Sequence, residues 1–402
     1  MKVIVVSNTC SDEMYKKLQD IKYSEKISPQ QNYFSMLIGG LIEQPNTDVV
    51  CVTARSIAEN NTKVKELSFC SEKISDNLAF VYTKVKSGNR TRNITNYLQT
   101  RRVLKSILEK NNSVECVAII DPLSFDITSA ALSILRNVKK IALVTDIPMY
   151  IYAIGKEKES FAGKIKSRIK NLLFMKSINK FDGYCYLTES MNCLNKFKKP
   201  YCIIEGMVPV SEEIVERQDV QSKKRVILYA GGLYEKFGIK NLVEAAKLVD
   251  GKKFELHLYG EGNCITYIND VNNDYPHIKY MGVLDSVGIR EVETKASALI
   301  NPRPNEEEFT RFSFPSKTLE YMNTGRPVWT TRLSGIPDEY FNYINVIEDS
   351  SIDKIRVALE TIINLTEEEL DFMGQRSRAF ARNNKCATIQ AKKLLNYINS
   401  LV

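Results

Sequence analysis

The sequence predicts two doubly wound α/β domains of the Rossmann-like type, facing each other across a cleft. A length of 402 residues exceeds one ordinary domain. Short, nearly continuous apolar runs alternate with amphipathic helical windows, which is typical of parallel sheets covered by helices on both faces. The alternation stops near residue 206 and resumes at Arg225. The polar stretch between the two series indicates a linker.

The first domain is expected at residues 1–206, with the linker at 207–224. Its predicted strands are Val3–Val6, Val49–Thr53, Ala79–Val81, Cys116–Ile120, Lys140–Val144, Gly183–Leu187 and Tyr201–Ile204. Its predicted helices include Tyr33–Leu41, Thr95–Glu109 and Ile127–Leu135.

The second domain is expected at residues 225–383. Its predicted strands are Val226–Tyr229, Glu255–Tyr259, Ile278–Met281, Ala298–Ile300, Val328–Thr330 and Asn345–Ile347, with helices such as Leu242–Leu248 and Ser316–Met322 between them. A last helix at Thr388–Ile398, within 384–402, is expected to pack back on the first domain. Ligands of open α/β sheets bind beyond the carboxyl ends of the strands, so we expect the site there.

Composition limits the function classes. The chain is 44% hydrophobic and 26% charged, as in ordinary globular proteins. Nine scattered cysteines without a Cys-x-x-Cys pair indicate reduced thiols of a cytoplasmic protein. Because His257 and His277 have no neighbour at metal-ligand spacing and no Asp-x-Asp occurs, we expect no metal site. No run approaches membrane-spanning length, so the protein is expected to be soluble and at most peripheral.

The net charge of +8 is unevenly spread. Residues 156–180 hold eight basic side chains and two acidic ones, interleaved with apolar residues near helical spacing. A basic amphipathic helix can lie on anionic lipid. A helix that packs its apolar face on the core and exposes its basic face to solvent has the same pattern. The sequence is compatible with both hypotheses, a lipid-binding helix and a core-packed helix. Nucleic acid is not an expected partner, since no recognised binding motif accompanies the charge.

The clearest candidate for an anion site begins at Ser316. The strand at 298–300 is followed by a polar loop and then by a helix whose first residues are Ser316 and Lys317. A helix start offers unpaired N–H groups and the positive end of the helix dipole, to which Lys317 adds a cation. Glu320 lies on the same helical face. A Lys–Glu pair at this spacing is also commonly a solvated ion pair.

Three glycine-containing segments follow predicted strands of the second domain. They are Gly231-Gly232, Gly260-Glu261-Gly262 and Gly282. Glycine allows a backbone to approach a ligand closely, although each loop alone can also be a plain turn. The dinucleotide pattern GxGxxG and the P-loop pattern are absent.

Four segments together carry a family resemblance. They are Gly-Gly-Leu-x3-Phe-Gly at 231–238, Tyr-Gly-Glu-Gly at 259–262, Ile-x-Tyr-x-Gly at 278–282, and Pro-Ser-Lys-x-x-Glu-Tyr-x3-Gly-x-Pro-Val at 315–328. Residues 225–350 therefore resemble the donor domain of GT-B-fold retaining glycosyltransferases of the family-four type (glycosyl transferases group 1). The last segment is especially similar to bacterial enzymes of polysaccharide biosynthesis.

The resemblance implies a nucleotide-sugar donor in the second domain and a glycan or glycolipid acceptor in the first. It implies no cofactor and no metal, and it favours UDP over GDP as the nucleotide. Glu320 would bind the ribose hydroxyls and Lys317 the diphosphate. The other implied donor-binding residues are Gly231, Gly232, Lys236, Glu261, Gly282, Arg303, Ser316 and Thr318.

The sequence departs from the family pattern at the sugar end. Relatives carry a glutamate eight residues before the position of Glu320, where this chain has Phe312. Glu307 or Glu308 is the expected substitute, and Glu308 is the candidate catalytic carboxylate beside Lys317. Gly232 and Phe237 replace a family arginine and lysine, with Lys236 one residue early.

A family histidine of the first domain is also missing. Asp146 is the nearest polar candidate for its catalytic place, although an aspartate after a strand can equally form a turn. The expected function is a cytoplasmic, retaining, metal-independent hexosyltransferase that acts on a lipid-linked glycan, with 156–180 holding it at the inner face of the membrane. The alternatives are a sugar-nucleotide epimerase of the same fold, which the scarcity of histidine disfavours, and a degenerate, non-catalytic scaffold.

Overall fold

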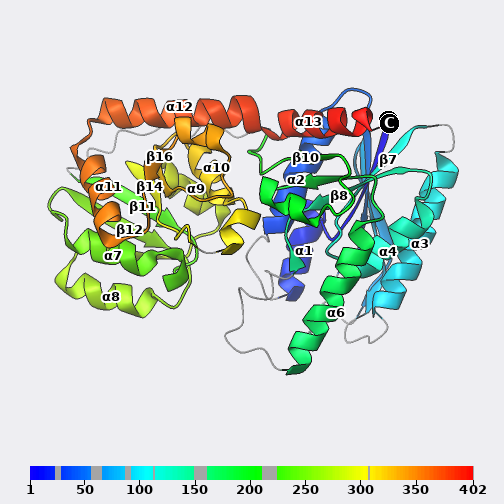
Figure 1. Cartoon of the computed structure of the whole chain (residues 1–402), viewed down its shortest axis with the longest axis horizontal. Helices are drawn as coiled ribbons and strands as arrows, with labels where there is room; N and C mark the ends of the chain where they lie inside the picture. The colour runs from blue at the N-terminus through cyan, green and yellow to red at the C-terminus, as the bar shows by residue number, and fades with distance from the viewer. Residues whose placement is uncertain are drawn as a thin grey trace. The chain divides into compact units, whose positions relative to one another are not determined.

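The computed structural model describes residues 1–22, 29–55, 66–86, 92–111, 114–148, 161–210, 224–306 and 308–401 (Figure 1). They form two compact units, of which unit 1 comprises Met1–Val210 with Ala387–Val402 and unit 2 comprises Ser211–Cys386. Each unit contains a sheet of mainly parallel strands with helices on its faces, which confirms the predicted α/β class. Most of the predicted linker, 207–224, lies outside the described residues.

The main sheet of unit 1 has the strand order β10-β9-β8-β7-β1-β2-β5-β4, and only β4 runs antiparallel to its neighbour. A separate antiparallel pair joins β3 and β6. Parallel β1 lies between β2 and β7, so the order of the sheet reverses there. The strands are β1 (Lys2–Ser7), β2 (Asp48–Thr53), β3 (Glu66–Leu67), β4 (Cys70–Ser75), β5 (Leu78–Tyr82), β6 (Val85–Lys86), β7 (Cys116–Ile120), β8 (Lys139–Val144), β9 (Gly183–Tyr186) and β10 (Tyr201–Ile203).

Helices cover the sheet of unit 1 in two groups. The group α1 (Asp12–Lys22), α2 (Pro29–Ile42) and α13 (Ala387–Ser400) shares one apolar core with the strands. In the second group, α3 (Arg92–Lys110) packs against α4 (Phe125–Ile134), and α4 packs against α6 (Phe161–Ile178). Helices α2 and α13 lie very close together at Gly40. A Cβ on Gly40 would lie 2.1 Å from the carbonyl oxygen of Ala387, so there is no room for a side chain.

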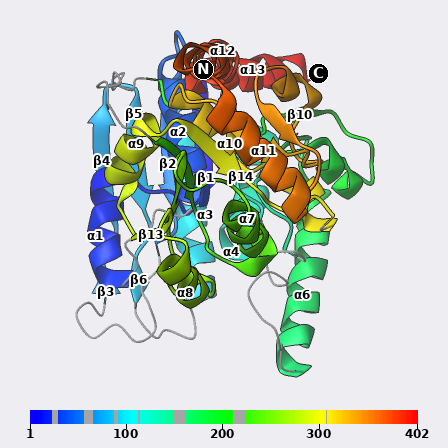
Figure 2. The ribbon, with the colours of Figure 1, turned by 90° about the vertical axis from the view of Figure 1, so that its left-hand side faces the viewer.

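Unit 2 has a wholly parallel sheet in the order β13-β12-β11-β14-β15-β16. Its strands are β11 (Arg225–Ala230), β12 (Phe254–Tyr259), β13 (Ile278–Gly282), β14 (Ala298–Asn301), β15 (Val328–Thr331) and β16 (Asn345–Ile347). Its helices are α7 (Ile239–Lys247), α8 (Ile265–Asp274), α9 (Ser286–Lys295), α10 (Ser316–Asn323), α11 (Ile352–Asn364) and α12 (Glu367–Lys385). Figure 2 shows helices α7, α8, α10 and α11 of this unit. The strand order reverses between β11 and β14, and a doubly wound sheet binds its ligands at such a switch point.

Candidate functional site

The switch point of unit 2 is bordered by the double-glycine loop that follows β11. The N–H of Gly231 donates to the carbonyl oxygen of Tyr259 at 2.9 Å, and the N–H of Leu233 donates to that of Glu261 at 2.7 Å. These bonds continue the pairing of β11 with β12 beyond the strands. They fix the loop as a flat backbone surface at the carboxyl edge of the sheet.

The second glycine loop lies directly against the first. Gly260 has φ +129°, and a Cβ there would lie 1.8 Å from the carbonyl oxygen of Gly231. The N–H of Gly260 donates to the carbonyl oxygen of Gly282 at 2.9 Å, and the hydroxyl of Tyr280 donates to the carbonyl oxygen of Gly260 at 3.1 Å. The three glycine segments therefore form one continuous layer in which Gly260 has no room for a side chain.

Helix α10 starts beside this layer. It begins at Ser316 directly after Pro315, as the sequence predicted. A Cβ on Gly231 would lie 2.9 Å from Cε of Lys317, so the lysine stem covers the double-glycine loop. The buried hydroxyl of Tyr321 accepts from the N–H of Ala230 at 2.9 Å and donates to the carbonyl oxygen of Ala230 at 3.2 Å. These contacts place the helix start, with its N–H groups, next to backbone that glycine leaves open.

Lys317 and Glu320 form an ion pair at the helix start. Nζ of Lys317 lies 3.8 Å from Oε2 of Glu320, and the side chains are 32% and 45% exposed. The hydroxyl of Ser316 donates to Oε1 of Glu320 at 3.1 Å. The solvated pair that the sequence allowed is therefore present. Because an exposed pair of this kind is worth only about 0–1 kcal/mol, Lys317 can exchange it for a phosphate oxygen at small cost.

The other predicted donor-binding residues differ in how far their side chains are exposed to solvent. The guanidinium of Arg303, just after β14, lies over the ring of Phe237 at 5.4 Å. The Lys236 ammonium lies over the same ring at 5.4 Å, and its side chain is exposed. Glu261 is also exposed and Gly282 is half-buried. Thr318 differs from these, since it is 1% exposed and its hydroxyl therefore faces the interior instead of a ligand.

The sugar end of the predicted site is less defined. Phe312 is buried, and the guanidinium of Arg311 lies over its ring at 4.7 Å. A buried ring cannot replace a glutamate that contacts sugar hydroxyls. Glu307 lies outside the described residues, as does the side chain of Glu308, so the catalytic role of Glu308 stays a prediction.

The carboxyl edge of unit 1 carries two aspartates on neighbouring strands. Asp146 follows β8, where burial raises its pKa and the N–H of Ile147 donates to it at 2.8 Å. Asp121 follows β7 and is fully buried, which raises its pKa to about 6, against hydrogen bonds from Leu123 and Gln30. Asp121 stands where the strand order of unit 1 reverses. Asp121 was not among the residues predicted from the sequence, although it follows the apolar run that ends at Ile120 much as Asp146 follows its own strand.

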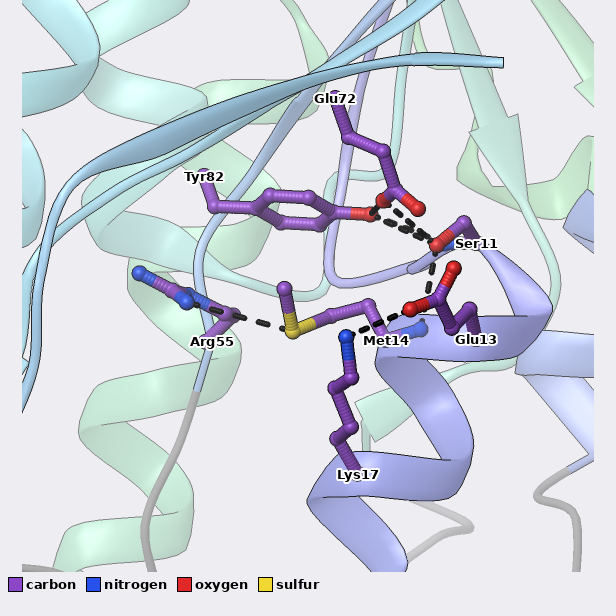
Figure 3. Close-up of polar contacts among 7 residues, drawn as sticks. All are labelled: Ser11, Glu13, Met14, Lys17, Arg55, Glu72 and Tyr82. Carbon is purple, nitrogen blue, oxygen red and sulfur yellow. Dashed lines mark hydrogen bonds and ion pairs between the residues drawn. The ribbon is translucent and has the colours of Figure 1, made fainter.

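A polar cluster occupies another part of unit 1 (Figure 3). Oε2 of Glu72 accepts hydrogen bonds from the hydroxyls of Ser11 at 2.7 Å and Tyr82 at 2.8 Å. Buried Arg55 donates to the carbonyl oxygen of Thr83 at 2.9 Å and lies over the Tyr82 ring at 5.2 Å. These groups satisfy one another and tie edge strand β4 to the start of α1. We therefore assign the cluster a structural role and place the candidate polar site of unit 1 at Asp121 and Asp146.

Two kinds of feature are absent from the described ranges. No group of three or more His, Cys, Asp or Glu side chains there could hold a metal ion. Within the same ranges, no helix combines the length and apolar character that crossing a membrane requires.

Comparison with known proteins relates part of unit 2 to a family. Residues 224–364, which include both glycine loops and α10, match the family described as glycosyl transferases group 1. A search of curated protein sequences found no match for the chain.

Solved structures with the GT-B fold resemble the whole chain, and not residues 224–364 alone. Trehalose-6-phosphate synthase OtsA has a TM-score of 0.68 at 8% identity, and the lipopolysaccharide outer core galactosyltransferase WaaB has 0.60 at 14% identity, with full coverage of both chains in each comparison. TarM has 0.55 at 17% identity over 79% of this chain and 59% of its own. At these identities the likeness shows the fold, which agrees with the family resemblance found in the sequence.

Proposed function

We propose that the protein is a retaining, metal-independent glycosyltransferase that transfers a sugar from a nucleotide-diphosphate donor to a lipid-linked glycan in surface polysaccharide synthesis. The family match within unit 2 and the fold of the whole chain support a glycosyltransferase. The observation that carries the proposal is the position of Lys317, at the start of α10 and against Gly231 at the switch point.

The chemistry of this position suits a departing diphosphate. The N–H groups at the start of α10, the Lys317 ammonium and the Arg303 guanidinium would stabilise the charge that develops as the sugar leaves. The N–H groups are fixed by the helix before the nucleotide sugar binds, so they need little reorganisation. Glu320, one turn along α10, would accept hydrogen bonds from the ribose hydroxyls.

We propose UDP as the nucleotide and retention as the stereochemical outcome on the basis of similar structures. One similar structure is trehalose-6-phosphate synthase from E. coli bound with UDP-2-fluoro glucose, with 9% identity and a TM-score of 0.66. A second similar structure, with 10% identity and a TM-score of 0.65, is of a trehalose-6-phosphate synthase described for glycosyltransfer with retention. We extend both properties to this chain because its donor domain carries the family motif around Lys317 and Glu320.

Isothermal titration with UDP and with GDP tests the donor site. We expect wild-type protein to bind UDP and Lys317→Ala to bind it roughly tenfold to a hundredfold more weakly, as expected for a lost hydrogen bond between charged groups. Lys247→Ala is the matched control, because Lys247 forms the same i,i+3 ion pair with Glu244 in the last turn of α7, away from the carboxyl edge. Equal binding by all three proteins would contradict the assignment of Lys317.

The ribose contact of Glu320 has its own test. Glu320→Ala should weaken the binding of UDP while changing the binding of 2′,3′-dideoxy-UDP little, because the missing hydroxyls already remove the contact. If Glu320→Ala weakens both ligands equally, Glu320 does not contact the ribose.

A scaffold without activity is the second candidate, and buried Phe312 is the observation that favours it. The same titration separates the two functions. Binding of neither UDP nor GDP would favour the scaffold, whereas UDP binding lost in Lys317→Ala favours the transferase.

We also propose that α6 attaches the protein to the surface of a membrane. Ile169 and Leu172 are 53% and 69% exposed there, and Arg168 and Lys176 are exposed beside them. Exposed apolar side chains with cations can bind anionic lipid. We expect the protein to sediment with phosphatidylserine vesicles at low salt, and Leu172→Asp to reduce this. Equal sedimentation with neutral phosphatidylcholine would contradict a charge-dependent attachment.

A further inference from the structure

Helix α9 carries a carboxyl group inside the protein. Glu293 is 3% exposed, and its Oε1 has no hydrogen-bond partner within the part of the chain that the structure describes. A carboxylate in such a place loses its hydration without gaining a donor, so the uncharged acid is the cheaper form. An unsatisfied buried oxygen in a native fold calls for a physical explanation.

The charges around Glu293 belong to the candidate diphosphate site. Burial is the main cause that raises the pKa of Glu293, to about 8. The cation of Lys317 lowers it, the carboxylate of Glu320 raises it, and Arg290 on α9 lowers it. Glu293 in turn helps burial to raise the pKa of the Tyr321 hydroxyl. Glu293 is therefore coupled to both charged residues at the start of α10.

Local contacts hold α9 near α10 and the turn that follows it. The guanidinium of Arg326 donates through Nε to the carbonyl oxygen of Thr294 at 2.8 Å, and its Nη1 donates to Asp371 at 2.9 Å. Thr294 is the neighbour of Glu293 in α9. These bonds hold the Glu293 segment of α9 to the turn that follows α10, independently of the ion pair at the start of that helix.

We propose that Glu293 is a positioning residue for Lys317, and that a nucleotide diphosphate binds to the form of the protein in which Glu293 carries its proton. This rests on the proposed function of the donor site. Neutral Glu293 leaves the Lys317 ammonium available to phosphate oxygens. Ionised Glu293 attracts that ammonium from the buried side and repels the diphosphate, so it weakens binding.

The proposal predicts that binding of a nucleotide diphosphate takes up a proton and that its affinity changes with pH. A bound diphosphate adds negative charge near Glu293 and raises the pKa of the carboxyl further. Binding must then take up a proton over the range between the two pKa values, and affinity must fall as pH rises through it. The phosphate groups of UDP ionise near pH 6, the uracil N3–H loses its proton above about pH 9 and a free lysine ionises above pH 10, so the interval from about pH 7.5 to about pH 8.5 isolates Glu293.

The experiment is isothermal titration of the full chain with UDP across that interval, in buffers of different ionisation enthalpy. For wild type we expect proton uptake on binding and a Kd that rises about twofold to threefold over this interval, as one linked carboxyl with a pKa shift of about one unit gives. Glu293→Gln should bind at about pH 7.5 within roughly threefold of wild type, because the amide resembles the neutral acid, and should show neither uptake nor the rise in Kd.

Glu291→Gln is the matched control. Glu291 lies on α9, exposed and paired with Lys295, so this variant should keep the proton uptake of wild type. If wild type takes up no proton, or if Glu293→Gln still does, the role of Glu293 is refuted while UDP binding stands. If wild type binds neither UDP nor GDP, the proposed function itself fails. Should Glu293→Gln not fold, Glu293→Leu removes the carboxyl and makes the same comparison.

Discussion

Substitution of Gly260 by alanine should disrupt the glycine layer beneath the donor site. Its Cβ would lie 1.8 Å from the oxygen and 2.9 Å from the carbon of the Gly231 carbonyl, so the backbone of the first loop must move. Overpacking of this kind costs about 1–3 kcal/mol. A side chain at φ +129° adds about 1–2 kcal/mol. We therefore expect Gly260→Ala to lower the free energy of unfolding of unit 2 by about 2–5 kcal/mol.

Gly282→Ala is the matched control for this prediction. Gly282 has φ +86°, but nothing lies within 4 Å of the place of its Cβ, so only the backbone cost of about 1–2 kcal/mol applies. Denaturant unfolding followed by tryptophan fluorescence reports on unit 2, because the single tryptophan of the chain is Trp329 in β15. Equal destabilisation by the two substitutions would refute the claim that the loops are in contact.

Three further predictions concern single groups. Tyr321→Phe leaves the N–H of Ala230 without its acceptor and should cost about 1–3 kcal/mol of stability by the same fluorescence assay. Thr366→Ala removes the capping box of α12 and should cost about 0.5–2 kcal/mol, whereas Thr366→Ser should cost much less. Burial holds the pKa of Asp121 at about 6, above its unfolded value of about 3.9, so the folded state binds more protons between these values and stability falls as pH rises through them. Asp121→Asn should remove about 2 kcal/mol of this dependence between about pH 4 and about pH 7 when unfolding is measured at both, and an unchanged dependence would contradict the buried carboxyl.

The sequence was informative wherever an apolar run is buried. Val3–Val6 and Val226–Tyr229 lie within β1 and β11, because a central parallel strand must be apolar on both faces. Strand β4 was missed, since Cys70–Ser75 pairs on one side only and alternates half-buried with exposed polar residues. The position of Lys317 followed from Pro315-Ser316, which starts a helix by local rules alone.

Other parts of the site depend on the tertiary fold. Thr318 was expected among the donor-binding residues, yet the turn of α10 directs its side chain into the core. Glu293 reads in the sequence as one of several charged residues of an exposed helix, Glu291, Glu293 and Lys295 among them. Only the packing of α9 shows that this carboxyl, unlike its neighbours, is buried. Coupling between α9 and α10 has no signal in local spacing.

The measurement that tests the central claim most directly is the release of nucleotide diphosphate from a panel of nucleotide sugars. We expect the wild-type protein to release UDP from at least one UDP-sugar. Release should fall with Lys317→Ala and stay unchanged with Lys247→Ala. Release of no nucleotide diphosphate from any sugar of the panel, or undiminished release by Lys317→Ala, would contradict a donor site at the start of α10.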